Sequence, residues 1–153
     1  METQKVTDFV GLDLSAAFDT VDHSILLSVL ENRFGIVGSA KEWISSYLHS
    51  RSFFVHALGS SSTPKSIDFS VPQGSCIGPV LFTYYSSTLE EVASRQDADI
   101  CGYADDHGIF SAFQPGTSNE TDTINSLENC LSSVQIWMNA NRLRPKTWKK
   151  KSR

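Results

Sequence analysis

Apolar residues recur with two different periods along the chain, and these periods predict where strands and helices form. Residues 6–14 (VTDFVGLDL) are mostly apolar over a short stretch, which favours a central strand. Residues 23–34 and 39–49 repeat apolar side chains at helical spacing, so each is expected to form a helix with one buried face. Asp22 is placed to cap the first of these helices, and Gly35 is placed to end it.

The second half of the chain shows the same two periods, interrupted by turns. Stretches rich in β-branched and aromatic residues at 52–58 and 66–71 predict a hairpin around the loop 59–64. A longer apolar stretch predicts a helix over 79–93, which accepts Pro79 in its first turn. The remaining elements are expected to be strands over 98–103 and 108–113 around a tight turn at 104–107, and then a helix over 121–139.

The order of these elements predicts an α+β fold, with helices packed on one face of a small antiparallel sheet. No internal repeat or linker divides residues 6–146, which are therefore expected to form one domain. The periodic pattern is lost after Asn141, and residues 147–153 are predicted to be a solvated basic tail.

Composition and charge limit the class of protein. Apolar residues make up 40% of the chain, enough for a buried core. No apolar run approaches the roughly 18 residues of a membrane span, and the polar start is no secretory signal, so an intracellular protein, nuclear or cytoplasmic, is expected. Three cysteines without a CxxC pattern argue against a disulfide framework or a zinc site. The net charge of −4 is the wrong sign for a typical nucleic-acid binder, and the basic residues gather near the end of the chain. The acidic remainder indicates either clustered metal-binding carboxylates or the absence of the parts that grip nucleic acid.

Three aspartates are candidates for chemistry. Asp13 lies near the end of an apolar strand, and Asp105 and Asp106 lie at a predicted hairpin tip. Antiparallel strands of one sheet could bring these carboxylates together, where they would repel one another unless a cation neutralised them. Hard oxygen ligands select Mg²⁺ or Mn²⁺, and two such ions about 3.5–4 Å apart support phosphoryl displacement. On spacing alone, a solvated Asp-Asp turn and a strand-end Asp explain the same residues.

Four segments resemble, in order, the motifs of reverse transcriptases from LINE-type (non-LTR) retrotransposons. The resemblance covers about residues 6–146, and its first two segments are long and distinctive. The segments are LDLSAAFDTVDH (12–23) for motif A, VPQGSCIGPVLF (71–82) for motif B, YADD (103–106) for motif C, and SLENCLSSVQIWMNANRLRP (126–145) for the helix that leads into motif D.

The resemblance implies a polymerase palm and gives roles to particular residues. Asp13 and Asp105 would be metal ligands, with Asp106 the third carboxylate and the Leu14 carbonyl a further ligand, for two Mg²⁺ or Mn²⁺ ions. Phe18 lies where the family places a bulky side chain that would clash with a ribose 2′-hydroxyl, although it also fits a core position.

The same resemblance implies contacts with nucleotide, primer and template. Gln73 and Gly74 match the motif B pair near the nascent base pair, although a plain turn explains them as well. Tyr103 would contact the primer end or lie in the core, and Lys146 stands where the register of the family lysine is uncertain. The four histidines, which show no catalytic or metal-binding spacing, are interpreted as structural or surface residues.

The implied activity is RNA-directed DNA synthesis from a primer, an RNA template and deoxynucleoside triphosphates. The expected segments for fingers and thumb are absent, so a palm segment inactive by itself is the leading hypothesis. Under a second hypothesis, the chain polymerises weakly by itself, or does so with fingers and thumb that are supplied separately. A relic palm that binds nucleic acid or protein without catalysis is the alternative.

Overall fold

The chain forms two compact units, each described here by itself. In the computed structural model, one unit comprises Met1–Ala17 and Ser86–Arg153, and the other comprises Phe18–Tyr85. The described residues are 6–49, 51–72, 74–116 and 118–152, without the side chains of 118–119 and 147–152.

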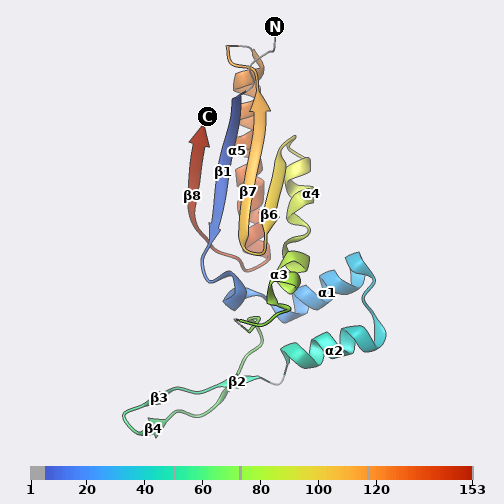
Figure 1. Ribbon diagram of the computed structural model, residues 1–153, viewed down its shortest axis with the longest axis vertical. Helices are drawn as coiled ribbons and strands as arrows, with labels where there is room; N and C mark the ends of the chain where they lie inside the picture. The colour runs from blue at the N-terminus through green and yellow to red at the C-terminus, as the bar shows by residue number, and fades with distance from the viewer. Residues whose placement is uncertain (1–5, 50, 73, 117, 153) are drawn as a thin grey trace. The chain divides into compact units, whose positions relative to one another are not determined.

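The first unit is built on a four-stranded antiparallel sheet. Its strand order is β6-β7-β1-β8 (Figure 1). Strand β1, the first in the chain, pairs with β7 on one side and with β8 on the other, so it is central, as its apolar sequence predicts. The strands are β1 (Val6–Leu14), β6 (Asp99–Tyr103), β7 (Asp106–Phe113) and β8 (Pro145–Ser152).

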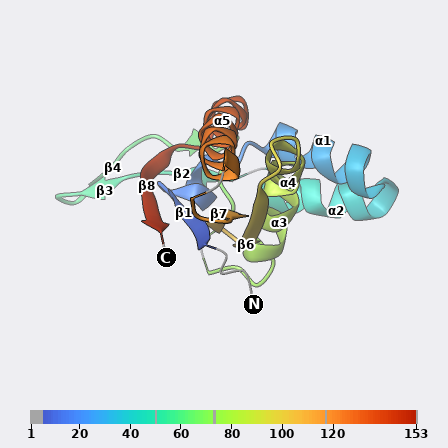
Figure 2. The ribbon, with the colours of Figure 1, turned by 90° about the horizontal axis from the view of Figure 1, so that it is seen from above.

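Two helices complete this unit. Helix α5 (Ser118–Ala140) lies over one face of the sheet and contacts β7, while α4 (Leu89–Ser94) contacts α5 and β6 (Figure 2). The indole N–H of Trp137 donates to Thr88 Oγ1 at 2.9 Å, which ties α5 to the residue before α4. The core of the unit includes Val10, Leu12, Ile109, Leu127, Cys130, Val134 and Met138, all of which are buried.

In the second unit, two helices follow the short 3-10 turn Ala17–Thr20. Helix α1 (His23–Phe34) begins where the Asp22 carboxylate accepts hydrogen bonds from the backbone N–H groups of Ser24 (2.9 Å) and Ile25 (3.1 Å). It ends at Gly35, whose φ of 65° lies in the left-handed region. Both ends of this helix are therefore as predicted.

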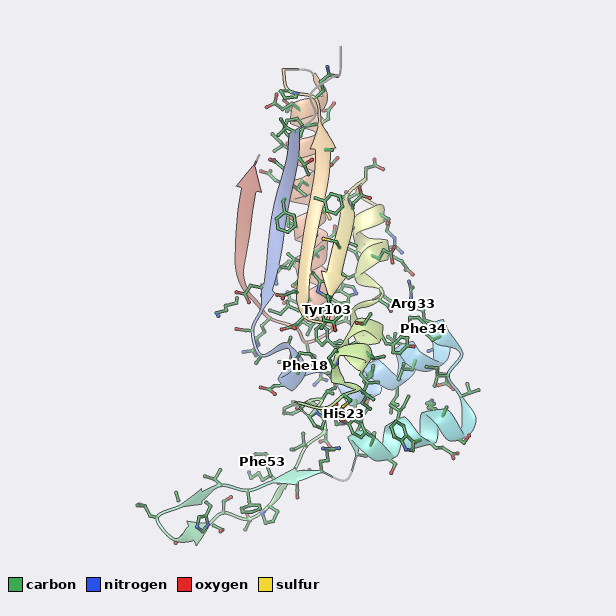
Figure 3. All side chains as sticks on the ribbon, viewed as in Figure 1. Phe18, His23, Arg33, Phe34, Phe53 and Tyr103 are labelled. Carbon is green, nitrogen blue, oxygen red and sulfur yellow. The ribbon has the colours of Figure 1, made fainter. Side chains whose placement is uncertain are left out.

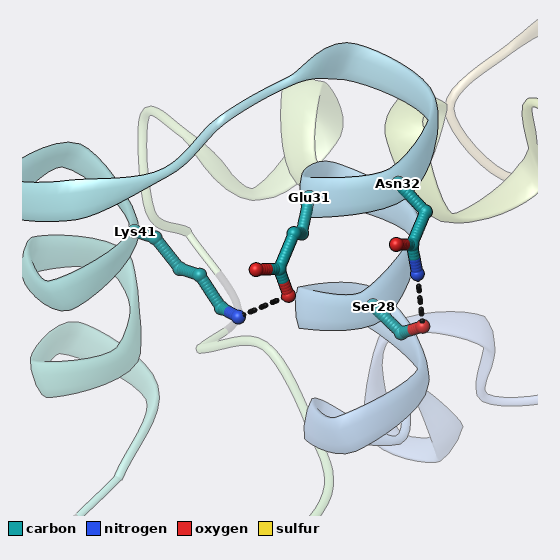
Figure 4. Close-up of polar contacts among 4 residues, drawn as sticks. All are labelled: Ser28, Glu31, Asn32 and Lys41. Carbon is teal, nitrogen blue, oxygen red and sulfur yellow. Dashed lines mark hydrogen bonds and ion pairs between the residues drawn. The ribbon is translucent and has the colours of Figure 1, made fainter.

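Helix α2 (Gly38–Leu48) packs against α1. The ammonium group of Lys41 in α2 pairs with the carboxylate of Glu31 in α1 (Figure 4). Within α1, Asn32 Nδ2 donates to Ser28 Oγ at 3.0 Å, one turn away (Figure 4). These contacts lie on the exposed side of the helix pair, so they contribute little to stability.

A hairpin and a third helix follow α2. The hairpin consists of four two-residue strands, paired as β2 with β5 and β3 with β4, and α3 (Gly78–Ser86) comes later in the chain. The strands are β2 (Ser52–Phe53), β3 (His56–Ala57), β4 (Ser60–Ser61) and β5 (Lys65–Ser66).

The expected fold class is confirmed, and several local predictions are wrong. The helix expected over 79–93 is two helices, α3 and α4, because the chain breaks at the hydroxyl residues 87–88, which favour helix ends over interiors. The strands expected over 52–58 and 66–71 are shorter. Residues 147–152 are not a solvated tail, because they pair with β1 as part of β8. None of the described helices combines the length and apolar character that a membrane crossing requires.

Candidate active site

The strand register brings two of the three candidate carboxylates to opposite positions. Leu12 on β1 pairs with His107 on β7, so continuing the register by one residue places Asp13 opposite Asp106. Residues directly opposite in an antiparallel pair have Cα atoms about 4.5–5.5 Å apart and side chains on one face. Tyr103 on β6 pairs with Asp106 from the other side, so it belongs to the same face.

The third carboxylate lies in the turn between β6 and β7. Because Tyr103 pairs with Asp106, the turn contains only Ala104 and Asp105, and it is tighter than the four-residue turn predicted. Ala104 has a φ of 53°, in the left-handed region that non-glycine residues rarely adopt. Asp105 is half-buried and Asp106 is exposed.

His107, the second residue of β7, lies beside the backbone of this turn. Its imidazole forms a hydrogen bond with the backbone of Asp105. Burial lowers the pKa of His107 below its ordinary value, while this hydrogen bond and the charges of Asp105 and Asp106 oppose the decrease. A Cβ atom on Gly102 would lie 2.4 Å from Cδ2 of the His107 ring, so the ring occupies the space that a side chain at 102 would need.

The face of the sheet that carries Asp13 and Asp106 contains a hollow of about 630 Å³. Tyr103 at its edge is 79% exposed, which excludes the core alternative for this residue (Figure 3). The floor includes two opposed glycines, Gly11 and Gly108, and the ring of Phe9 lies over Gly108. The lining residues are Phe9, Gly11, Leu12, Asp13, Cys101, Gly102, Tyr103, Asp106, His107 and Gly108.

A β-bulge lies beside Asp13. The register between β1 and β8 pairs Asp13 with Thr147 and Leu14 with Pro145, so Lys146 is the extra residue of the bulge. Bulges are frequent next to active sites because they redirect a side chain. The structure therefore brings Lys146 to the strand next to Asp13 and Leu14.

The other candidate residues belong to the second unit. The ring of Phe18 packs against the ring of Phe82, with centroids 5.3 Å apart, and it is half-buried (Figure 3). Gly74 has a φ of 79° and is exposed, as a turn that requires glycine would have it. Gln73 lies outside the described residues.

The donor set suits a hard divalent cation, although no complete ion site is formed. Asp13 and Asp106 offer carboxylate oxygens on one face, and Asp105 is adjacent in the turn. Among the described residues, no three carboxylate, imidazole or thiol groups converge closely enough to hold a metal ion. The residues therefore fit such an ion in chemical type, while their side chains do not converge on one point.

An antiparallel sheet backed by helices, with aspartates near the end of its central strand and at the adjacent hairpin tip, is the arrangement expected of a polymerase palm-like fold. The family model for reverse transcriptase (RNA-dependent DNA polymerase) matches residues 1–152. The chain therefore belongs to the reverse transcriptase family, and the predicted resemblance is confirmed.

Its relatives include polymerases of mobile elements. The probable RNA-directed DNA polymerase from transposon BS of Drosophila melanogaster is 29% identical over 133 residues, which are 84% of this chain and 14% of that protein. The RNA-directed DNA polymerase from mobile element jockey of the same species is 28% identical over 142 residues, 90% of this chain and 15% of that protein. This chain thus spans about one seventh of the length of these relatives.

Solved structures show the same fold. The apo telomerase of Candida tropicalis, truncated from its C-terminal domain, matches with a TM-score of 0.69 and 14% identity over 99% of this chain and 32% of that chain. The telomerase of Candida albicans, in complex with a fragment of telomeric RNA, matches with a TM-score of 0.66 and 14% identity over 95% of this chain and 27% of that chain.

Sequence reasoning did not single out several residues of the site. Phe9 and Cys101 line the hollow, and alternation along the two predicted strands would have placed them on the face of Asp13 and Tyr103. The role of His107 in holding the Asp105 backbone had no signal, because it depends on the register between β6 and β7.

Proposed function

We propose that this chain supplies the catalytic carboxylates of an RNA-directed DNA polymerase. The observation that supports the proposal is the register: Leu12 pairs with His107, so Asp13 and Asp106 are the next residues along β1 and β7, and Asp105 lies in the adjoining turn. Carboxylate oxygens are the ligands that hard divalent cations prefer, and a bound cation would neutralise the negative charge of these three side chains.

Asp13, Asp105, Asp106 and the backbone carbonyl of Leu14 would hold two Mg²⁺ or Mn²⁺ ions. Such ions, when bound, stabilise the charge on the attacking and leaving oxygens of a phosphoryl displacement. The protein contributes position: Asp13 is paired with Thr147 of β8, and the preceding residue, Leu12, is paired with His107 of β7.

The substrates follow from the same assignment. An RNA template and an annealed DNA primer would meet the site, and Tyr103, which is exposed beside Asp106, would contact the primer end. Phe18 would exclude the 2′-hydroxyl of a ribonucleotide, and Gln73 with Gly74 would lie near the new base pair. Lys146, at the bulge beside Asp13, would face the triphosphate.

We expect full polymerase activity to need protein beyond the residues of this chain. The relatives are about seven times as long, so template and duplex contacts are expected to come from the rest of the polymerase. The described residues among the first 141 positions include few basic side chains that could neutralise phosphates. This scarcity is expected if other parts of the polymerase contact the template and the duplex.

Primer extension tests the proposal. The chain is incubated with an RNA template, an annealed DNA primer, Mn²⁺ and labelled deoxynucleotides, with Asp105→Asn and Asp99→Asn as variants. Asp99 is a matched control because it is an exposed aspartate on β6, remote from the turn. We expect any extension to be lost in Asp105→Asn and kept in Asp99→Asn. Extension that persists in Asp105→Asn would overturn the assignment.

A further inference from the structure

The hairpin of the second unit exposes aromatic side chains that the proposed catalysis does not use. Phe53, Phe54 and Val55 are 50%, 61% and 58% exposed, and Leu58 at the tip is fully exposed. Large exposed apolar side chains that gather in one segment often mark a binding surface. Figure 3 shows Phe53 on the hairpin strand, directed away from the ribbon of its own element.

Charge identifies the kind of partner. Residues 43–67 contain Arg51 and Lys65 and no acidic residue, whereas the whole chain carries 17 acidic residues against 13 basic ones. The register pairs Phe53 directly with Lys65, so an aromatic ring and an ammonium group share one face of the hairpin. The backbone N–H of Ile67 donates to the Arg51 carbonyl at 3.0 Å, which extends this pairing to Arg51.

A second aromatic platform leads into the hairpin from α2. The rings of Trp43 and Tyr47 stack with centroids 6.0 Å apart and an interplanar angle of 12°. The guanidinium of Arg51 lies 4.7 Å from the Tyr47 ring centroid, and its Nε donates to the Tyr47 carbonyl at 2.8 Å. Trp43 itself is 60% exposed. Aromatic and basic groups therefore alternate from α2 into β2.

We propose that the hairpin and the α2 aromatic pair form a binding surface for single-stranded nucleic acid. Unpaired bases would stack on Phe53, Phe54 and Trp43, and phosphates would meet Lys65 and Arg51. Stacking on aromatic rings combined with basic groups is the way in which proteins bind single strands without sequence preference. This surface goes beyond the proposed polymerase site, because it needs neither the carboxylates of the first unit nor a metal ion.

A second copy of this chain, docked edge to edge, is a less favoured partner for this surface. Each paired segment of the hairpin is only two residues long, which offers little backbone for strand addition. The positive charges of Arg51 and Lys65 would also repel the same charges on a second copy, because this segment has no acidic residue to pair with them.

Fluorescence anisotropy of labelled 20-nucleotide U-tract RNA and T-tract DNA, in EDTA, tests this inference with the whole chain. We expect both strands to bind more tightly than a duplex of equal length. Phe53→Ala should weaken binding about 5- to 100-fold, as expected for a lost base stack. Lys65→Gln should reduce the slope of log affinity against log salt by about 0.7, the value for one phosphate contact on a single strand.

Two control variants separate stacking from general apolar docking. Phe53→Leu keeps an apolar side chain but removes the ring, so it should bind nearly as weakly as Phe53→Ala, and Leu58→Ala should bind like the parent. Equal affinity of the parent and Phe53→Ala would overturn the inference. Concentration-dependent dimerisation that Phe53→Ala abolishes would also overturn it in favour of a self-contact. Asp99→Asn, an exposed position outside both proposed sites, should bind like the parent. Because the assay contains EDTA, a negative result would count against this surface and not against the polymerase assignment.

Discussion

The packing of His107 over Gly102 gives a quantitative prediction about the turn that carries Asp105. In Gly102→Ala, the new Cβ atom would lie 2.4 Å from Cδ2 and 2.9 Å from Nε2 of the imidazole. The ring is half-buried and hydrogen-bonded to the Asp105 backbone, so it cannot move without losing that bond. Overpacking of this kind costs about 1–3 kcal/mol. Alanine also restricts the unfolded chain more than glycine does, which offsets about 0.4–1 kcal/mol of this cost.

The free energy of unfolding should therefore fall by about 1–2 kcal/mol, which lowers Tm by about 2–8 °C in a protein of this size. Thermal unfolding followed by circular dichroism measures the change. Gly108→Ala is the matched control, because its Cβ would lie 2.3 Å from the Phe9 ring, an even closer approach. Phe9 is 38% exposed and can turn into solvent, so this variant should stay within about 1 kcal/mol of the parent.

A double-mutant cycle isolates the contact. His107→Ala removes the ring, so the cost of Gly102→Ala measured in that background should disappear, with a coupling of about 1 kcal/mol or more. If Gly102→Ala destabilises no more than Gly108→Ala, or if the two changes at 102 and 107 simply add, the proposed packing of the turn is wrong.

Four further outcomes follow from the structure. Asp22→Ala removes the acceptor for two backbone N–H groups of α1, and chemical denaturation should show a loss of about 0.5–2 kcal/mol, against no loss for the exposed Asp99→Asn. Ala104→Gly relieves a left-handed φ and should raise Tm, corresponding to about 1 kcal/mol; an unchanged or lower Tm would contradict the turn geometry. A maleimide should label the exposed Cys101 rapidly and Cys130 only after unfolding. The reason is that Cys130 is buried and burial raises the pKa of its thiol. Equal labelling rates at the two residues would contradict this prediction. Burial lowers the pKa of His107, so the unfolded chain binds a proton at a higher pH than the folded chain does. The free energy of unfolding should therefore decrease as the pH falls below about 6.5, and it should decrease less in His107→Gln. An identical pH dependence of the two proteins would contradict this prediction.

Local signals in the sequence predicted the elements whose ends are fixed by their own residues. The limits of β1 and α1 are correct because an apolar stretch defines the strand and because Asp22 and Gly35 cap the helix. The longest helix is also correct, although its first turn starts earlier than expected. Each of these elements shows its period within a dozen or so residues.

Features that depend on long-range pairing were missed. Strand β8 contains Trp148 as its only large apolar residue, so no period marks it, and it forms because β1 offers an unpaired backbone edge. Asp13 and Asp106 lie more than 90 positions apart, and their opposition follows from the register of β1 with β7, which spacing does not reveal. The resemblance of the surrounding motifs, rather than periodicity, identified them as a site.

Stabilisation by Mn²⁺ tests the central claim, that Asp13, Asp105 and Asp106 form a divalent-ion site on the open face of the sheet. An ion that binds only the folded chain raises Tm by mass action, whether or not the segment polymerises alone. Thermal unfolding with and without Mn²⁺ is compared for the parent, Asp13→Asn, Asp106→Asn and the control Asp99→Asn. The account predicts a rise for the parent and Asp99→Asn, and none for Asp13→Asn or Asp106→Asn. No rise in the parent, or the same rise in all four proteins, would contradict it.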